Sequence, residues 1–346
     1  MRETEFFFTS FDKQHEVRAL LWEADEGASS DASDDPAASS SSSSSSVYPR
    51  GIVQILHGMA EHIERYRGFA EYCISRGFIV CGLDHVGHGK SVEGPHKHGV
   101  VPSNGDIVFV EDAHQLRLLM QERFATTGTL GAASSSTAEP LELPYFMLGH
   151  SMGSFVLRNY LATYAGGVKA AVLCGTGHPS PLLSSAGSCI ARILSALKGP
   201  EYRSPFLHNL SVGAYSQQID NARTPQDWLS TDDSIVDEYI AAADCGYMFS
   251  TSGNIALTAL TKTMVQSKTA EALPRDFPLL FIAGSDDPVG EKGASVKKAV
   301  DLYKNTGHKN VTLILYENKR HEVLNETNKE QVYSDVTDWL LEHRED

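Results

Sequence analysis

The chain has 346 residues, 41% of them hydrophobic, enough to bury the core of one large domain or of two average ones. Its 29 basic and 44 acidic side chains give a formal net charge of −15, which repels phosphate backbones and argues against a nucleic-acid partner. The cysteines are odd in number and scattered, so we expect reduced thiols and a cytoplasmic protein. We find no secretory signal and no apolar run long enough to span a membrane, which leaves at most transient surface contact.

Two segments differ from the rest of the chain in composition. Residues 27–47 are rich in Ser, Ala and Asp and end in an unbroken serine run, and residues 125–140 are rich in Thr, Gly, Ser and Ala. Such segments cannot offset their ordering entropy by burying apolar surface. We therefore predict two low-complexity insertions that carry no chemistry.

Outside these insertions, short apolar runs alternate with amphipathic stretches, the pattern of parallel strands joined by helices. It predicts a doubly wound α/β sheet. The expected strands are 52–56, 78–83, 145–148, 170–174, 278–283 and 311–315. The expected helices include 63–75, 111–124, 152–164 and 328–343, the last opened by a capping box of Thr327 and Glu330.

The alternation stops between residues 178 and 275, where helical patterns predominate. Ile190, Ile193, Leu194 and Leu197 are spaced as one face of a helix. We interpret 178–275 as an inserted helical cap between two parts of the core, 1–177 and 276–346. We expect this face to pack inside the cap, although the spacing fits a membrane-facing or substrate-facing surface equally well.

A possible nucleophile follows the strand at 145–148. Residues 149–153 read Gly-His-Ser-Met-Gly, which matches the G-x-S-x-G turn that exposes a strained serine between a strand and a helix. A serine hydroxyl needs an imidazole to take its proton and a carboxylate to orient that imidazole. The sequence therefore predicts that Ser151 is the first member of a catalytic set.

An acid and a histidine follow at the ends of later strands. Asp286 and Asp287 come after the strand at 278–283, and His321 comes after the strand at 311–315, before the last helix. Pro288 restricts the residue before it, so we favour Asp287 as the triad acid over Asp286. Backbone N–H groups of Met152 and of Met59, which follows the first predicted strand, are the expected oxyanion donors.

Together these segments resemble the α/β-hydrolase family of monoacylglycerol lipases and lysophospholipases. The resemblance rests on the segments His57–Tyr66 (HGMAEHIERY), Asp84–Ser91 (DHVGHGKS), Gly149–Gly153 (GHSMG), Gly284–Gly290 (GSDDPVG) and His321–Glu326 (HEVLNE). It covers nearly the whole chain outside the insertions. It implies a triad of Ser151, Asp287 and His321, an oxyanion hole from Met59 and Met152, a helical cap over an acyl pocket, and no metal or organic cofactor.

Parts of the sequence also fit three other kinds of site. Six histidines between His57 and His98 raise the question of a metal site, but no cysteine or carboxylate completes a ligand spacing, so we expect no metal site.

Epoxide hydrolases and haloalkane dehalogenases have a similar layout with an aspartate nucleophile, which Ser151 contradicts. A serine aminopeptidase of the proline iminopeptidase type would need an acidic group in the cap, for which the candidates are Asp232, Asp233, Asp237 and Glu238.

The resulting hypothesis is a serine esterase acting on a single-acyl lipid, a monoacylglycerol or a lysophospholipid, through an acyl-enzyme. A non-catalytic scaffold protein is the alternative from another class, and the presence of all three triad residues argues against it. The expected partner is a small acyl ester.

Overall fold

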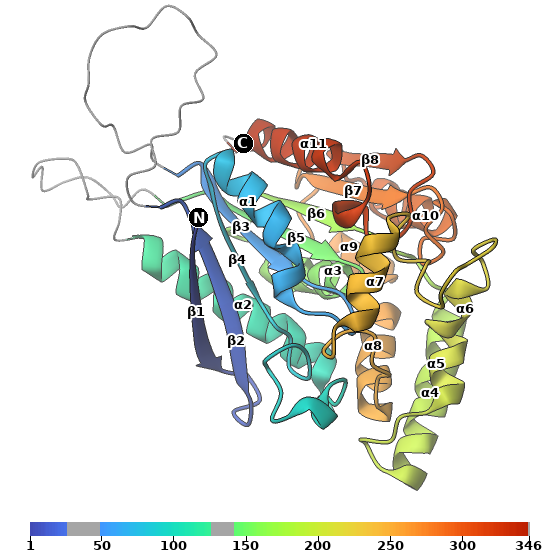
Figure 1. Cartoon of the computed structure of the whole chain (residues 1–346). Helices are drawn as coiled ribbons and strands as arrows, with labels where there is room; N and C mark the ends of the chain where they lie inside the picture. The colour runs from blue at the N-terminus through green and yellow to red at the C-terminus, as the bar shows by residue number, and fades with distance from the viewer. Residues whose placement is uncertain (26–48, 126–141, 345–346) are drawn as a thin grey trace, which may run out of the picture.

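The computed structural model describes residues 1–25, 49–125 and 142–344, and eight strands of this part form one sheet (Figure 1). The strand order is β1-β2-β4-β3-β5-β6-β7-β8, in which β3 to β8 run parallel and β2 is antiparallel to both of its neighbours. The strands are β1 (Arg2–Thr9), β2 (Glu16–Glu23), β3 (Gly51–Leu56), β4 (Phe78–Leu83), β5 (Tyr145–His150), β6 (Ala170–Cys174), β7 (Leu279–Gly284) and β8 (Val311–Tyr316).

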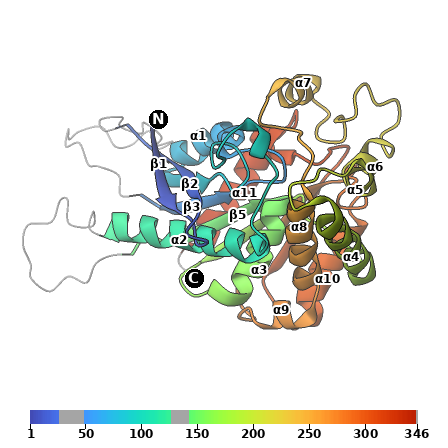
Figure 2. The same ribbon diagram turned by 90° about the horizontal axis from the view of Figure 1, so that it is seen from below.

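Helices cover both faces of the sheet, because the central strands are buried on both sides. One face packs against α1 (Arg67–Ser75) and α11 (Lys329–Glu342) through residues such as Phe69 and Val336. The other packs against α2 (Gly105–Ala125), α3 (Met152–Tyr164) and α10 (Ala294–Asn305) through Leu116, Val156 and Val296. Figure 2 shows α1 and α2 on opposite sides of the strands. The predicted doubly wound, mostly parallel sheet is confirmed.

The N-terminal hairpin was not predicted. β1 and β2 pair over their whole length and extend the sheet beyond β4 as an antiparallel edge. The side chains of β1 are mostly exposed, and Phe7 is 50% exposed, so this strand has no continuous buried run. In β2 the apolar pattern is interrupted by Arg18, which is buried and pairs with Asp84.

The predicted capping box before α11 is wrong. The N-cap residue is Asn328, and its side chain makes no capping hydrogen bond. The Thr327 hydroxyl instead accepts a hydrogen bond from Lys319 Nζ at 2.6 Å. A tertiary contact therefore replaces the local one at this position.

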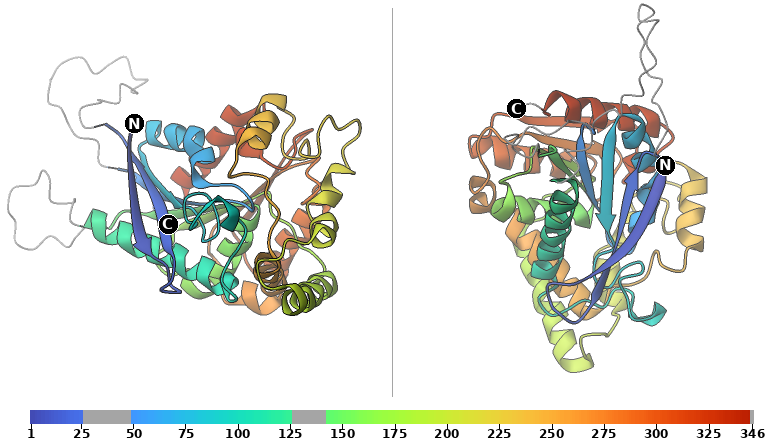
Figure 3. Two further views of the ribbon diagram at one scale, coloured as in Figure 1. Left: turned by 60° about the horizontal axis from the view of Figure 1, so that its bottom comes forward. Right: turned by 90° about the vertical axis from the view of Figure 1, so that its left-hand side faces the viewer.

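The segment predicted as a cap contains α4 (Pro181–Lys198), α5 (Pro205–Leu210), α6 (Gly213–Ser216), α7 (Asp233–Ala241), α8 (Thr251–Met264) and α9 (Ser267–Glu271). The helices α4, α5 and α6 lie at the opposite side of the molecule from β1 (Figures 1 and 3). By contrast, α8 packs Leu260 and Met264 into the same core as α2 and α3. The predicted domain boundaries at 178 and 275 stay predictions.

The expectation that the apolar face of α4 packs inside the cap is wrong for half of its residues. Ile193 is 54% exposed and Leu197 is 74% exposed, whereas the buried residues of α4 are the small Ser184 and Ala191. The Ser184 hydroxyl accepts a hydrogen bond from Thr261 of α8 at 3.1 Å. Small side chains let α4 and α8 approach closely, and the large aliphatic ones then face outward.

Both predicted low-complexity insertions lie outside the described residues, except that Ala125 ends α2. Among the helices of the described ranges, none combines the length and the apolar character that crossing a membrane requires. The described residues also contain the 3₁₀ turns η1 (Ile63–Tyr66), η2 (Pro95–Lys97) and η4 (Val323–Asn325).

Candidate active site

Ser151 occupies a strained turn between β5 and α3. Its φ of 51° lies in the left-handed region, which residues other than glycine rarely adopt. The flanking glycines are required by close packing, because a Cβ on Gly149 would lie 2.4 Å from the carbonyl oxygen of Gly153, and one on Gly153 would lie 2.0 Å from that of Leu56. The G-x-S-x-G segment therefore has the strand–turn–helix setting that the motif needs.

His321 and Asp287 are hydrogen-bonded in the interior. Nδ1 of His321 lies 3.0 Å from Oδ2 of Asp287, and both side chains are almost completely buried. The other oxygen of Asp287 accepts the backbone N–H of Val289 at 2.8 Å. By contrast, Asp286 is exposed and contacts the Ser285 hydroxyl. The Nε2 atom of His321 is buried and makes no hydrogen bond to any described residue, so it is available to a nucleophile in the pocket.

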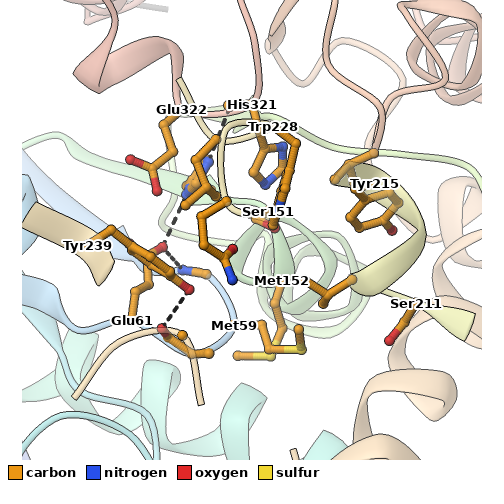
Figure 4. Close-up of a pocket in the computed structure, with 18 of the residues that line it drawn as sticks. Met59, Glu61, Ser151, Met152, Ser211, Tyr215, Trp228, Tyr239, His321 and Glu322 are labelled. Atoms are coloured by element: carbon orange, nitrogen blue, oxygen red, sulfur yellow. Dashed lines mark hydrogen bonds and ion pairs between the residues drawn. The ribbon is translucent and has the colours of Figure 1, made fainter. Parts of the chain in front are cut away.

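The two methionines expected to supply oxyanion donors lie beside Ser151. Met59 and Met152 line the same pocket as Ser151 and His321 (Figure 4). Met152 is the first residue of α3, where backbone N–H groups have no partner within the helix. Met59 follows β3 in a tight turn, and the next residue, Ala60, has a φ of 56°. The structure thus brings all five sequence-predicted site residues to the carboxyl edge of the sheet.

The pocket around these residues has a volume of about 740 Å³ and a largely apolar lining. Its core side is formed by Met59, Met152 and Phe155, and its cap side includes Val212, Tyr215, Trp228 and Leu229. The cap segment 228–229 is joined directly to the triad loop, because the carbonyl of Leu229 accepts the N–H of Glu322 at 2.7 Å. The ring centroids of Trp228 and His321 are 5.0 Å apart.

A buried charge network supports this edge of the site. Arg65 donates to Glu61 at 2.6 Å and forms two hydrogen bonds of 2.7 Å with Glu322. Burial alone would lower the pKa of the Arg65 guanidinium, but the negative charges of Glu322 and Glu61 raise it well above its usual value. Glu61 also accepts the Tyr66 hydroxyl at 2.8 Å and the Gly58 N–H at 2.6 Å. The network therefore ties the Met59 loop to the His321 loop.

His150 extends the network to the nucleophile. Its Nδ1 lies 3.2 Å from Glu61 Oε1 and 2.7 Å from the Tyr66 hydroxyl. Burial would lower the pKa of His150, but the hydrogen bond with Glu61 and its charge raise it. Burial would likewise raise the pKa of Glu61, but the hydrogen bond with His150 and the charge of Arg65 hold it well below its usual value.

Sequence reasoning missed this network. The i,i+4 spacing of Glu61 and Arg65 and the position of Glu322 next to His321 were visible signals. The long-range pairing of Arg65 with Glu322 was not, because the two residues are 257 positions apart.

Three histidines near the site are buried and packed as aromatic rings. His57 accepts the N–H of His85 at 3.0 Å, and the His85 and His88 ring centroids lie 5.0 and 6.1 Å from that of Phe109. Burial lowers the pKa of all three imidazoles, so they are neutral at pH 7. This environment suits a packing role.

The acidic cap residues that an aminopeptidase would need lie elsewhere. Asp233 and Asp237 are 73% and 58% exposed and pair with Arg223 on the surface. Asp232 is the N-cap of α7, and Glu238 is exposed. None of the four is among the described residues that line the pocket.

Comparison with known proteins gives one family and several relatives. Residues 48–328 match the family model described as serine aminopeptidase, S33 (Hydrolase_4). The chain is 29% identical to a monoacylglycerol lipase of Mycolicibacterium smegmatis over 85% of this chain and 89% of that protein. It is 26% identical to the monoglyceride lipase of Homo sapiens over 84% and 82%. A thermostable carboxyl esterase from Bacillus coagulans superposes with a TM-score of 0.78 at 26% identity, covering 99% of both chains.

The fold and these similarities define the class of this protein: it is an α/β hydrolase that acts on carboxylic esters. Within that class, the chain belongs to the Hydrolase_4 (serine aminopeptidase, S33) family.

Proposed function

We propose that the protein cleaves the ester of a single-acyl lipid, a monoacylglycerol or a lysophospholipid, through an acyl-enzyme. The observation that carries the proposal is the buried His321–Asp287 hydrogen bond at the edge of an apolar pocket that also contains strained Ser151. Apolar lining suits an acyl chain, and the relatives named monoacylglycerol or monoglyceride lipase support a glyceride head group.

The residues have the following roles in this proposal. His321 Nε2 takes the proton of the Ser151 hydroxyl as its oxygen attacks the ester carbonyl, and the protonated imidazole then returns that proton to the leaving alcohol. Asp287 holds the imidazole in the tautomer that has its proton on Nδ1. The N–H groups of Met59 and Met152 stabilise the oxyanion. Water activated by the same imidazole releases the fatty acid.

A series of p-nitrophenyl esters from acetate to palmitate tests the acyl preference. It is run beside mono-oleoylglycerol, oleoyl lysophosphatidylcholine and an amino-acyl naphthylamide, with Ser151→Ala as the blank. We expect faster turnover of medium or long chains and of one of the two lipids, and a loss of at least about 10⁴-fold in Ser151→Ala. Rates that stay flat or fall with chain length would contradict a lipid substrate. Turnover of the amino-acyl naphthylamide alone would establish an aminopeptidase.

A fluorophosphonate probe separates an enzyme from a catalytically inactive scaffold. We expect labelling of the wild type that disappears in Ser151→Ala, while the circular dichroism spectrum stays unchanged. No labelling of the folded wild type would support the scaffold.

The proposal includes transient contact of α4 with lipid aggregates. Leu182, Leu183 and Leu197 are 70–80% exposed on this helix. Because the chain carries a net charge of −15, we expect contact with zwitterionic and not with anionic vesicles. In a vesicle-flotation assay, replacing the three leucines with serine should abolish association without changing p-nitrophenyl butyrate hydrolysis; unchanged association would contradict this contact.

A further inference from the structure

A mixed set of metal-ligand side chains lies where the cap meets the loop that carries Met59. His62 directly precedes η1, three residues after Met59, and Asp244 and Cys245 lie in the loop between α7 and α8. Their donor atoms all lie within 4.8 Å of one another. His62 Nε2 is 3.6 Å from Asp244 Oδ1. This set was not predicted from the sequence, because the cysteine and the carboxylate come from a segment about 180 positions away from His62.

We propose that His62, Asp244 and Cys245 bind a Zn²⁺ ion that fastens the cap to the Met59 loop. An imidazole, a carboxylate and a thiolate are ligands that zinc prefers, whereas Mg²⁺ and Ca²⁺ prefer oxygen ligands alone. Zinc bond lengths of about 2.0–2.3 Å in a tetrahedron place the donor atoms roughly 3.5 Å apart. The His62–Asp244 pair already has this separation, and the donor atoms of all three residues lie within 4.8 Å of one another.

The charges around the proposed ion partly cancel, because Glu61 and Glu322 are already paired with Arg65. The negative charge that holds a dication would therefore come from its own ligands, the Asp244 carboxylate and the Cys245 thiolate. Asp244 is 37% exposed and His62 is 14% exposed, so an ion can reach the site from solvent. Three protein ligands leave a fourth position for water.

Binding requires the Cys245 thiol to lose its proton. The Zn–S bond forms as the S–H proton passes to solvent. Each bound ion releases one thiol proton, and no redox step is involved.

The place of the site suggests what the ion does. Gly246 and Tyr247, which follow Cys245, line the pocket. The Gly246 N–H and the Tyr239 hydroxyl both donate to the carbonyl of Ala60, at 2.9 and 3.0 Å. A metal between His62 and Cys245 adds a further attachment between the cap and this loop. We expect bound zinc to hold the cap closed and to slow turnover; that effect rests on the proposed function, whereas the binding site does not.

Cobalt tests the site independently of activity. After treatment of the full chain with a chelator, one equivalent of Co²⁺ should produce thiolate-to-cobalt charge-transfer absorption. Cys245→Ser should abolish it, and Cys189→Ser, which alters the exposed thiol of α4, should not. His62→Gln and Asp244→Asn change the more accessible ligands, so each should weaken binding even if Cys245→Ser folds poorly. Absence of the absorption in the wild type, or its persistence in Cys245→Ser, would overturn the site.

Zinc is then tested for stability and turnover. Saturating Zn²⁺ should raise the melting temperature of the wild type by roughly 5 °C and that of His62→Gln much less. It should slow ester hydrolysis several-fold, reversibly with a chelator, in the wild type and in the control His96→Ala. Equal inhibition of His62→Gln would overturn the coupling to the cap. Cobalt binding through Cys245 in a chain that hydrolyses no ester would support the site and contradict the proposed function.

Discussion

Among single residues, the adjacent carboxylates of Asp286 and Asp287 have different surroundings. Asp287 is buried against His321, whereas Asp286 is exposed. Asp287→Asn would donate from its amide towards His321 and stabilise the wrong tautomer, so we expect kcat for a p-nitrophenyl ester to fall by about 10⁴-fold. Asp286→Asn should change kcat by less than about threefold, because surface carboxylates contribute little. A larger loss in Asp286→Asn would exchange the two roles.

Arg65 offers a second test, in this case of the stability of the fold. Removing it leaves Glu61 and Glu322 buried without their cation, so Arg65→Met should lower the free energy of unfolding by about 3 kcal/mol or more. The matched control is Arg67→Met, because Arg67 pairs with Glu3 while 43% exposed, and its loss should cost less than about 1 kcal/mol. Urea unfolding measures both. Equal effects would mean that the buried network adds nothing beyond a surface ion pair.

Between helices and strands, Asp112 of α2 anchors the turn that joins β1 to β2. It accepts the N–H of Phe11 at 2.7 Å and the Ser10 hydroxyl at 2.9 Å. Burial raises the pKa of Asp112 from 3.8 to about 6, although these hydrogen bonds oppose the rise. The folded state therefore binds the proton more tightly than the unfolded state does. The contribution of Asp112 to the free energy of unfolding is therefore fully present below about pH 4 and is lost as the pH rises through about 6.

This sign predicts the behaviour of Asp112→Asn, whose side chain stays neutral. The difference in the free energy of unfolding, variant minus wild type, should rise by on the order of 2 kcal/mol between about pH 4 and about pH 7, because only the wild type loses stability as Asp112 ionises. Melting curves across this range measure the difference. The exposed Asp301→Asn serves as the control. A difference that is constant with pH would show that Asp112 does not titrate in this range.

The hairpin of β1 and β2 could not be predicted from the sequence, whereas the central strands could. The central strands were predictable because they are buried on both faces and so form continuous apolar runs, such as Ile52–Leu56. An edge strand with one solvated face lacks that signal, and Arg18 in β2 is stabilised by partners from three other segments, Glu5, Glu64 and Asp84. Ser151 and His321 were predictable because a turn motif and a strand end marked them. By contrast, no local pattern marks the pairing of Arg65 with Glu322 or the proximity of His62 to Cys245, because the fold brings these residues together from distant parts of the chain.

In the molecule as a whole, the pocket lies at the carboxyl ends of β3 and β5. Residues 26–48 connect β2 to β3, and residues 126–141 connect α2 to β5. The described residues that flank these two segments lie at the amino ends of the parallel strands, the opposite edge of the sheet. Changes in the length of either segment should therefore not reach the site.

Deleting residues 29–46 tests this separation. Residues 24–28 and 47–50 remain, nine in all, and can span roughly 30 Å, whereas β2 and β3 are separated by β4 and lie about 10 Å apart. We expect kcat/KM for a p-nitrophenyl ester to stay within about twofold and the melting temperature to change by less than about 2 °C, because the entropy of closing a connection depends only weakly on its length. A large fall in melting temperature with kcat/KM retained would show that the segment packs on the core. A fall in kcat/KM alone would place it near the pocket, against the connectivity of the sheet.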